Sequence, residues 1–428
     1  MNKVIGVIGL WHLGCVICAS WSKLGNKIMG FDYDSSLIEN LNKGSTPIYE
    51  PNLSEIIQEG LSNKRIVFSN DIDSLSPCDF IFLSYDTPIL NSDFSDTKIL
   101  EKSVDDVRNV MKDDSVLIVS SQSPVGLCTL LRLKLKEKNP SLDLAYSPEN
   151  LRLGNAIYCY LNPERIILGV SDSKTKEDCT NLFSQIKANI YSMNLESAEM
   201  VKHGINSFLA MSIVFANHLA DICENVGACI EDVILGIKSD PRIGQKAYLS
   251  PGIGFSGGTL GRDLKVLEQK NLDKSGPAKI FGIIHELNSE RKCSIINRII
   301  NILTKIKGDT IGVLGLTYKP GTSTLRRSLP LEIVDILIDK KYKVKVYDPK
   351  ADYSELSCNP KFTIASSIKD VSTSSNILVL LTEWELFRNY DWRKIPKLMK
   401  NAIFFDTKNF LDETTMILFG FKYYSLGK

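Results

Sequence analysis

The first 32 residues of the chain contain a pattern that few folds accommodate: a strand, a glycine turn, a helix and a second strand that ends in an acid. The apolar run at 4–8 predicts a buried strand, residues 15–24 predict a helix, and residues 27–31 predict a second strand, followed by Asp32. A helix between two parallel strands packs on the sheet they share, so this unit predicts an α/β fold with a doubly wound sheet. Asp32 suits the adenosine ribose hydroxyls of NAD, and its charge would repel the extra phosphate of NADP.

The turn between the first strand and its helix reads Gly-Leu-Trp-His-Leu-Gly. Gly9 and Gly14 stand where dinucleotide-binding turns have glycine. In such turns a middle glycine lets the backbone approach the pyrophosphate, and here Trp11 replaces that glycine. A tryptophan fits there with ordinary backbone angles and its ring turned away, or with its ring over the phosphates. We assign Gly9, Trp11, Gly14 and Asp32 to the cofactor site.

A second glycine-rich segment, 251–264, reads Pro-Gly-Ile-Gly-Phe-Ser-Gly-Gly-Thr-Leu-Gly-Arg-Asp-Leu. A flexible linker would be glycine and serine without the embedded Ile253 and Phe255. Glycine at this density lets the backbone approach a ligand closely, although an ordinary turn between helices gives the same composition. An Arg-Ile-Gly sequence at 242–244 precedes the segment and adds a second feature to be explained.

With that preceding sequence, the segment resembles the active-site loop of the UDP-glucose/GDP-mannose (nucleotide-sugar) dehydrogenases. Their loop runs Gly-Phe-Gly-Gly-Ser-Cys-Phe-Pro-Lys-Asp. The resemblance places the family's nucleophilic cysteine on Thr259 and its loop aspartate on Asp263. The change from thiol to hydroxyl at Thr259 is the main departure from the family pattern.

Shorter motifs of the same family follow in family order. Thr87-Pro88 matches a turn near the nicotinamide half of the cofactor, and Gln122 replaces a threonine of the family's Ser-Thr-Val-Pro-Val-Gly. In the stretch from 147 onwards, Glu149 keeps a glutamate that acts as a base toward the acyl-enzyme in the family. Leu153 replaces a second glutamate and can neither exchange a proton nor accept a hydrogen bond.

Apolar residues recur at helical spacing from 196 to 226, and neither proline nor glycine interrupts 205–226, which predicts a long helix. Lys202 and Asn206 stand four residues apart and therefore share one face. Such a pair is commonly solvated surface, but Glu199-x-x-Lys202-x-x-x-Asn206 matches the family's helix, which forms a dimer core and so implies a homodimer. An ammonium and an amide can stabilise the oxygen of an alcohol that loses a hydride and a proton.

The last third repeats the α/β pattern. Strands are predicted at 310–316 and 343–349, and residues 325–330 predict the opening of a helix. These segments match the family's second Rossmann-like half. Lys319 and Arg326 bracket the first turn, where cations could meet a nucleotide diphosphate, although a solvated basic loop is the alternative.

The resemblance thus implies two Rossmann-like doubly wound domains joined by a long central helical dimerisation region. The expected domains are 1–195 for NAD, 196–300 for dimerisation and the active-site loop, and 301–428 for the nucleotide sugar. The implied catalytic residues are Glu149, Lys202, Asn206, Thr259 and Asp263. The implied cofactor contacts add Thr87, Pro88, Gln122 and Arg326. The implied substrate contacts are Glu149, Leu151, Lys202, Arg242, Tyr248, Gly254, Phe255, Gly257 and Lys319.

Composition narrows the possible partners. A net charge of +1 across 428 residues gives no basic field for nucleic acid. The apolar run at 4–8 is too short for a signal peptide or a membrane span, so we expect a cytoplasmic protein. The only Cys-x-x-Cys, Cys15 and Cys18, lies in a helix pattern and predicts buried thiols. The histidines show no ligand spacing, and we predict no metal site.

The residues favour NAD-dependent oxidation of a nucleotide-diphosphate sugar in one two-electron step, because Thr259 has no accessible anion without a dedicated base. Two alternatives remain. A four-electron oxidation could pass through an aldehyde hydrate and give a uronate without a thioester. A non-catalytic nucleotide-sugar-binding protein would explain Trp11 in the phosphate turn.

Overall fold

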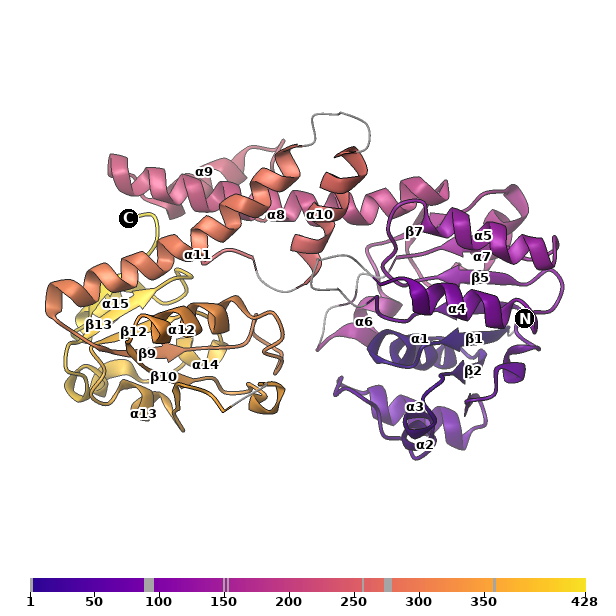
Figure 1. Ribbon diagram of the computed structural model, residues 1–428, viewed down its shortest axis with the longest axis horizontal. Helices are drawn as coiled ribbons and strands as arrows, with labels where there is room; N and C mark the ends of the chain where they lie inside the picture. The colour runs from indigo at the N-terminus through magenta and orange to yellow at the C-terminus, as the bar shows by residue number, and fades with distance from the viewer. Residues whose placement is uncertain are drawn as a thin grey trace. The chain divides into compact units, whose positions relative to one another are not determined.

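The chain divides into two compact units, residues 1–204 and 205–428. The computed structural model describes residues 3–87, 96–148, 151, 154–255, 258–272, 279–356 and 359–428. Figure 1 labels many of the elements of each unit. The boundary falls within a helix, whereas the sequence suggested three domains with limits near 195 and 300.

The first unit is built on an eight-stranded sheet in the order β3-β2-β1-β4-β5-β6-β7-β8. All its strand pairs are parallel except β6 with β7, which meet antiparallel at Tyr146 and Gly169. The first six positions have the doubly wound order of dinucleotide-binding sheets. The strands are β1 (Val4–Ile8), β2 (Lys27–Phe31), β3 (Ile66–Ser69), β4 (Phe80–Leu83), β5 (Val116–Val119), β6 (Asp143–Tyr146), β7 (Arg165–Gly169) and β8 (Asn189–Met193).

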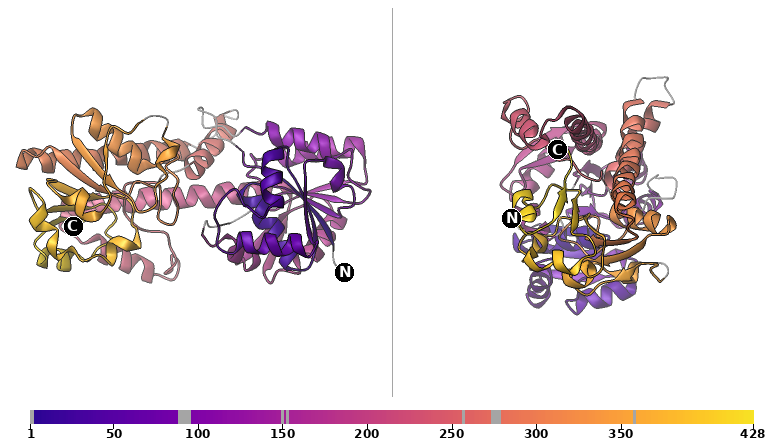
Figure 2. Two further views of the ribbon diagram at one scale, coloured as in Figure 1. Left: turned by 90° about the horizontal axis from the view of Figure 1, so that it is seen from below. Right: turned by 90° about the vertical axis from the view of Figure 1, so that its left-hand side faces the viewer.

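Helices cover both faces of this sheet, as the left view of Figure 2 shows. On one face α1, α3, α6 and α7 bury apolar residues such as Val16 and Ile57. On the other face α4, α5 and the first turn of α8 do so, with Leu100 and Leu131 among the buried residues. The helices are α1 (His12–Lys23), α2 (Ser35–Asn42), α3 (Leu53–Ser62), α4 (Lys98–Val107), α5 (Leu127–Lys138), α6 (Ala156–Leu161) and α7 (Ser173–Phe183), with a 3₁₀ turn at Ile72–Leu75.

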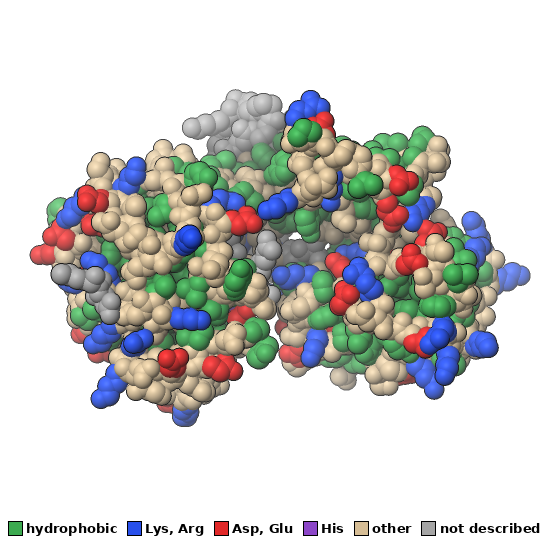
Figure 3. Space-filling model, turned by 180° about the vertical axis from the view of Figure 1, so that it is seen from behind, with side chains coloured by type: hydrophobic (Ala, Val, Ile, Leu, Met, Phe, Trp, Pro, Cys, Tyr) green, Lys and Arg blue, Asp and Glu red, His purple; other side chains and the backbone are tan. Residues whose placement is uncertain are grey.

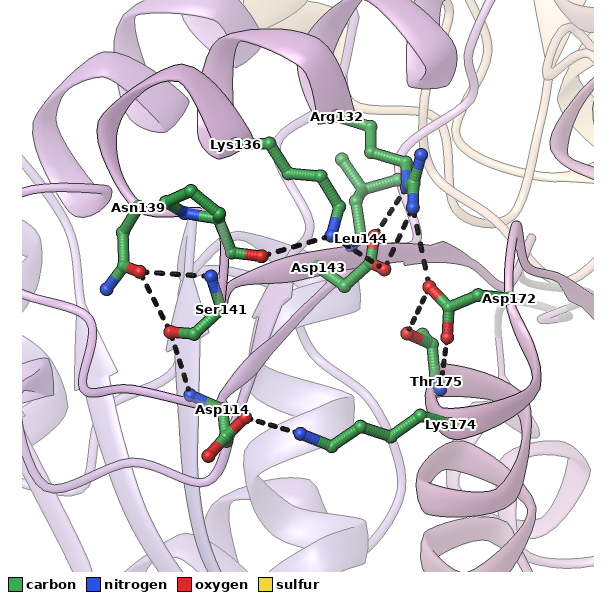
Figure 4. A network of polar contacts seen from close by, with 11 residues as sticks. Asp114, Arg132, Lys136, Asn139, Ser141, Asp143, Leu144, Asp172, Lys174 and Thr175 are labelled. Atoms are coloured by element: carbon green, nitrogen blue, oxygen red, sulfur yellow. Dashed lines mark hydrogen bonds and ion pairs between the residues drawn. The ribbon is translucent and has the colours of Figure 1, made fainter.

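A group of ion pairs fastens α5 to β6 and to the start of α7 (Figure 4). Arg132 donates from Nε and Nη2 to the two oxygens of Asp143, at 2.5 and 3.0 Å, and Lys136 lies 3.2 Å from the same carboxylate. Arg132 also reaches Asp172, which caps α7. Burial opposes the charge of Asp143, but the bonds from Arg132 outweigh it and hold the pKa of this carboxyl well below its usual range.

The long helix predicted near 196–226 is α8 (Leu195–Val226), and α9 (Ile230–Ser239), α10 (Thr259–Leu272) and α11 (Lys279–Ile306) follow it. Among the described residues, α8 is the one helix long and apolar enough to cross a membrane by length and composition; 44% of its most apolar window is buried. Core helices of folded proteins pass the same test.

The second unit contains a fully parallel sheet in the order β11-β10-β9-β12-β13-β14. Its order is that of the first six strands of the other sheet, so the chain holds two copies of one topology. The strands are β9 (Thr310–Leu314), β10 (Lys343–Tyr347), β11 (Thr363–Ile364), β12 (Ile377–Leu380), β13 (Ile403–Asp406) and β14 (Lys422–Tyr424). The helices are α12 (Leu329–Asp339), α13 (Ile368–Ser372), α14 (Glu385–Arg388) and α15 (Glu413–Leu418), with 3₁₀ turns at Tyr353–Glu355, Trp392–Lys394 and Pro396–Leu398.

The predicted fold class is confirmed, and three boundaries are corrected. The first helix begins at His12, three residues earlier than expected, because Trp11 is extended (φ −74°, ψ −154°) and serves as the N-cap. The strands at 310–316 and 343–349 end two residues early, because Gly315 and Asp348 belong to the turns that follow. On the face shown in Figure 3, basic and acidic side chains are interspersed.

Candidate active site

The turn after β1 has the geometry of a dinucleotide-binding turn. Gly9 has φ +92°, and its N–H donates to the carbonyl of Phe31 at 3.0 Å. A Cβ on Gly14 would lie 1.8 Å from the carbonyl oxygen of Gly9, so α1 packs against the turn as only glycine permits. Trp11 keeps ordinary backbone angles and is 46% exposed. Two of the three glycine functions are therefore retained, and α1 still presents its N-terminus to an anion.

Asp32 follows β2 and is buried beside this turn. Its Oδ2 accepts the N–H of Leu10 at 2.7 Å, and its Oδ1 accepts the N–H of Asp34 at 3.1 Å. Tyr85 was missed by sequence reasoning: its ring lies 2.9 Å from where a Cβ on Gly9 would be. Burial, and then the charge of Asp32, raise the pKa of the Tyr85 hydroxyl. The carboxylate thus sits where a ribose acid is needed, and the glycine, the helix start and the acid together fit NAD.

Two predicted turns meet at the same edge of the sheet. Thr87 is buried after β4, and its hydroxyl donates to the carbonyl of Gln122 at 3.1 Å. Ser121 donates to the carbonyl of Leu83 at 3.2 Å. Pro88 lies outside the described residues, as do Glu149 and Leu153. Leu151 is half-buried and packs against the core shared by α1 and α6.

The start of α8 holds the Gln122 turn in place. Glu199 is fully buried and accepts from the Ser123 hydroxyl at 3.0 Å and from the N–H groups of Gly126 and Cys128 at 2.6 and 2.9 Å. One turn further on, His203 Nε2 lies 3.0 Å from the Ser123 carbonyl. The Glu199-x-x-Lys202 pattern therefore includes a carboxylate that positions a cofactor-side turn, which the sequence showed only as part of a match.

In the second unit, three side chains hold the glycine-rich loop before Thr259. Asn217 accepts the N–H of Gly252 at 2.7 Å, and Arg291 donates to the carbonyl of Gly252 at 2.9 Å. Asn288 grips both backbone groups of Phe255, at 2.8 and 3.1 Å. Gly254 has φ +106°, and a Cβ there would meet Asn288 at 2.6 Å.

This loop is therefore a fixed element and no linker. Phe255 packs with apolar residues of α8, α10 and α11, including Ala210, Leu264 and Ile284. The amides and the arginine that hold the loop carry no recognisable sequence pattern, because each reaches it from a distant part of the chain. Gly257 lies outside the described residues.

Two of the expected catalytic residues are in contact. Asn206 Nδ2 donates to Asp263 Oδ2, and both side chains are buried. Lys202 stands one turn before Asn206 on α8 and is half-buried. Thr259 is the first residue of α10 and is exposed; within the described part of the chain its hydroxyl has no hydrogen-bond partner. A carboxylate–amide pair is thus in place, and Thr259 has no base among these residues.

The remaining predicted residues lie on the surface of the second unit. Arg242 is exposed and pairs with Asp240 at 2.7 Å, and Tyr248 is exposed. Arg326 is exposed in the loop after β9, where its backbone N–H donates to Glu355 at 3.1 Å. Lys319 is half-buried in the same loop, with Nζ 5.5 Å from the centre of the Tyr318 ring.

The cysteines of the first helix are structural. Cys15 and Cys18 are buried as predicted, and burial, followed by the charge of Asp32, raises the pKa of Cys15 to about 12. A thiol so hard to ionise is a poor nucleophile and a poor metal ligand. Within the described ranges no cluster of three or more histidine, cysteine or acidic side chains could hold a metal ion.

Two sheets that share the order of six strands, the first with a dinucleotide turn and a ribose acid, define an NAD-dependent oxidoreductase of the double-Rossmann class. Comparison with known protein families identifies the family. Family models for the UDP-glucose/GDP-mannose dehydrogenases match in three parts: the NAD binding domain at residues 3–187, the central domain at 196–290 and the UDP binding domain at 312–413. The chain belongs to this family, acts as a nucleotide-sugar dehydrogenase and uses NAD.

Similar proteins cover the whole chain. A UDP-glucose 6-dehydrogenase of Rickettsia bellii is 33% identical over 99% of this chain and 99% of its own. One from Bacillus subtilis is 31% identical over 100% of this chain and 93% of its own. The solved structure of a UDP-glucose dehydrogenase from Pyrobaculum islandicum superposes with a TM-score of 0.88 at 23% identity, covering 99% of this chain and 97% of that chain. This last likeness concerns the fold alone.

Proposed function

We propose that this enzyme oxidises one alcohol group of a nucleotide-diphosphate sugar by two electrons and releases the carbonyl product. The observation that carries the proposal is the exposed hydroxyl of Thr259 at the position of the family's cysteine, with no base beside it among the described residues. A threonine without a base cannot form the covalent adduct on which a second hydride transfer would depend. NAD, when bound, accepts the hydride from the carbinol carbon.

The chain's own residues then serve the alcohol. Lys202 supplies a cation to the oxygen that loses its proton, directly or through water, and Asn206 supplies an amide donor. Asp263 fixes the amide of Asn206 through the bond that joins them. The alcohol loses one hydride and one proton, and an aldehyde or ketone remains. The nucleotide would engage the second sheet, with Lys319 beside its first turn.

The retained Asn206–Asp263 pair also favours one rival. A buried carboxylate could activate water on an aldehyde and allow oxidation of the hydrate to a uronate. The relatives named UDP-glucose 6-dehydrogenase make UDP-glucose the first substrate to try.

The test is to incubate the purified protein with NAD and a panel of nucleotide sugars, weigh the products by mass spectrometry and count NADH. A product lighter by two hydrogens with one NADH supports the proposal; a product that gains one oxygen and loses two hydrogens, with two NADH, contradicts it.

Thr259→Ala should leave the single oxidation intact, because the hydroxyl takes no part in it. Thr259→Cys restores the thiol and tests whether the residue at 259 alone blocks the second oxidation.

We also propose that α8 forms the core of a homodimer and that residues 196–300 act as its module. One side of α8 exposes a stripe of large apolar residues with spacings of three, four or seven: Phe208, Met211, Phe215, Ile222 and Val226. A face of this kind is normally covered by a partner. Phe208→Asp with Phe215→Asp should convert a dimer to a monomer in light scattering, and a wild-type monomer would refute the proposal.

A protein whose apolar helix is covered in this way should be cytoplasmic, and recovery in the membrane fraction would contradict that.

A further inference from the structure

The first turn of α1 holds an imidazole to which the cofactor motif assigns no role. His12 is the first residue of α1 and directly follows Trp11. Its Nε2 lies 3.0 Å from Glu50 Oε2, and its side chain is 15% exposed. Within the part of the chain that the structure describes, Nδ1 has no hydrogen-bond partner. One ring nitrogen is therefore occupied, and the other remains for a ligand.

Glu50 holds this ring from a fixed position. Its carboxylate is buried, Oε2 also accepts the N–H of Gly154 at 3.0 Å, and Oε1 accepts the N–H of Ala156 at 2.7 Å. An ionised carboxylate only accepts hydrogen bonds, so the hydrogen between the two side chains belongs to His12 Nε2. The carboxylate thereby fixes the tautomer of the ring and limits its rotation.

The same turn has lost one of its usual means of binding a diphosphate. A glycine in the middle position allows the backbone to approach the phosphates, and Trp11 has a side chain there. The N-terminus of α1 still favours an anion, and His12 is the first side chain on that terminus. A side-chain donor next to the missing glycine is what the turn needs to regain affinity.

We propose that His12 binds the diphosphate of NAD and that Glu50 is its positioning residue. In the complex, the ring lies between two anions, the carboxylate of Glu50 and the diphosphate. The imidazolium form gives each of them a hydrogen bond, from Nε2 and from Nδ1. The pair at 12 and 50 thus does part of the work that backbone does in turns with three glycines.

The test measures binding without turnover. NAD and ADP-ribose are titrated by calorimetry into wild type, His12→Ala and His12→Gln, and melting curves check that each variant is folded. Both ligands should bind about tenfold more weakly to both variants, because each loses one charge-assisted bond. Gln fills the space of the imidazole and can still donate to Glu50, so a loss shared by Gln and Ala reports the ring's charge. The KM for NAD should rise with it, while kcat at saturating NAD changes by less than about twofold.

Lys23→Gln is the matched control, because it removes a cation from the far end of the same helix and should leave both affinities unchanged. Unchanged NAD affinity in a folded His12→Gln variant would overturn the proposal. Weaker NAD binding with unaltered ADP-ribose binding would also overturn it, because the contact would then be with the nicotinamide half.

Two double variants separate the role of His12 from those of Glu50 and Trp11. Glu50→Gln should weaken NAD binding in wild type but have little further effect when His12 is already Gln. An equal effect in both backgrounds would mean that Glu50 acts through residues 154 and 156 and would contradict its positioning role. Trp11→Gly restores the middle glycine, so NAD should bind more tightly and His12→Gln should then cost less than about threefold.

Discussion

The two sheets present the same carboxyl edge, built from the same bonds. Gly9 donates to Phe31 at 3.0 Å in the first sheet, and Gly315 donates to Tyr347 at 2.8 Å in the second. The next residue in each turn donates to an acid at the end of the neighbouring strand, Leu10 to Asp32 and Leu316 to Asp348, both at 2.7 Å. The backbone of a dinucleotide turn is thus present twice.

Asp32 and Asp348 differ in how many hydrogen bonds their carboxylates accept from the protein. Asp348 Oδ2 also accepts from the N–H and hydroxyl of Thr317, at 3.0 and 3.1 Å, and from the Trp384 indole at 3.1 Å. Its Oδ1 accepts two more N–H groups, from residues 350 and 351, at 2.9 Å each. A carboxylate has about four lone-pair sites, and Asp348 already receives six donors.

The helices after the two turns differ as well. The first helix starts at His12, immediately after its turn, whereas α12 starts at Leu329, after a loop that runs from 315 to 328. The first edge therefore offers a helix N-terminus and a ribose acceptor together, which is what NAD requires. The second edge offers neither at its first turn, so nucleotide recognition there depends on side chains of the loop. A shared topology did not settle which ligand each sheet binds.

The largest expected effect comes from the glycine that only the first edge needs. Gly14→Ala places a Cβ 1.8 Å from the Gly9 carbonyl, and α1 must move away from the turn. We expect the first unit to lose about 3 kcal/mol of stability and to show no measurable NAD binding, while the second unit still binds UDP. Melting curves and calorimetry check both.

Gly236→Ala is the matched control, because it sits within α9 with open space around its Cβ position and should be slightly stabilising. If Gly14→Ala bound NAD normally, the close approach of α1 to the turn would not matter for the coenzyme.

Local patterns predicted the first two strands of each sheet in chain order. The strands at 4–8 and 27–31 stand as predicted, because each is an apolar run bounded by glycine or an acid. The start of α1 was placed late, because a tryptophan N-cap with no side-chain hydrogen bond gives no capping signal in the sequence.

The contacts that hold the site could not be predicted. Glu50 reaches residues more than a hundred positions away, and Asn288 reaches the loop residue Phe255 from α11. Such bonds depend on how the chain folds back on itself. The helix that carries Lys202 and Asn206 was predicted from its apolar spacing, and the pair itself was singled out by a match to a family. The role of this helix in holding the Gln122 turn through Glu199 appears only in three dimensions.

A smaller effect should distinguish the two acids. Asp348→Asn disturbs six donors in a buried position, so we expect it to destabilise the second unit by about 2 kcal/mol and leave NAD affinity unchanged. Asp32→Asn should do the opposite: little change in melting, and NAD binding weaker by about tenfold. If Asp348→Asn weakened NAD binding as much as Asp32→Asn does, the coenzyme would not be confined to the first edge.

The smallest expected effect is on the stability of the two units at low pH. The pKa of Asp143 in the first unit is lowered: burial opposes its charge, but the Arg132 bonds prevail. The pKa of Asp406 in the second unit is raised by burial, although Tyr423 and three N–H groups donate to it. A lowered carboxyl pKa adds stability above the unfolded value of about 4, and that stability is lost as the pH falls; a raised pKa does the reverse, favouring the fold at low pH.

Acid should therefore weaken the first unit before the second. Asp143→Asn removes the ion pairs that Asp143 forms with Arg132 and Lys136 (Figure 4) and should cost about 1 kcal/mol of stability at pH 7, a cost that shrinks as the pH drops below about 4. Melting temperatures of wild type and variant, measured from neutral pH to about pH 3, should converge as the pH falls. At low pH the wild type loses the stability that its ionised Asp143 provides, which the variant already lacks. Hydrogen exchange assigns the loss to a unit, and protection that fell first in the second unit would show that Asp143 does not set the acid limit of this fold.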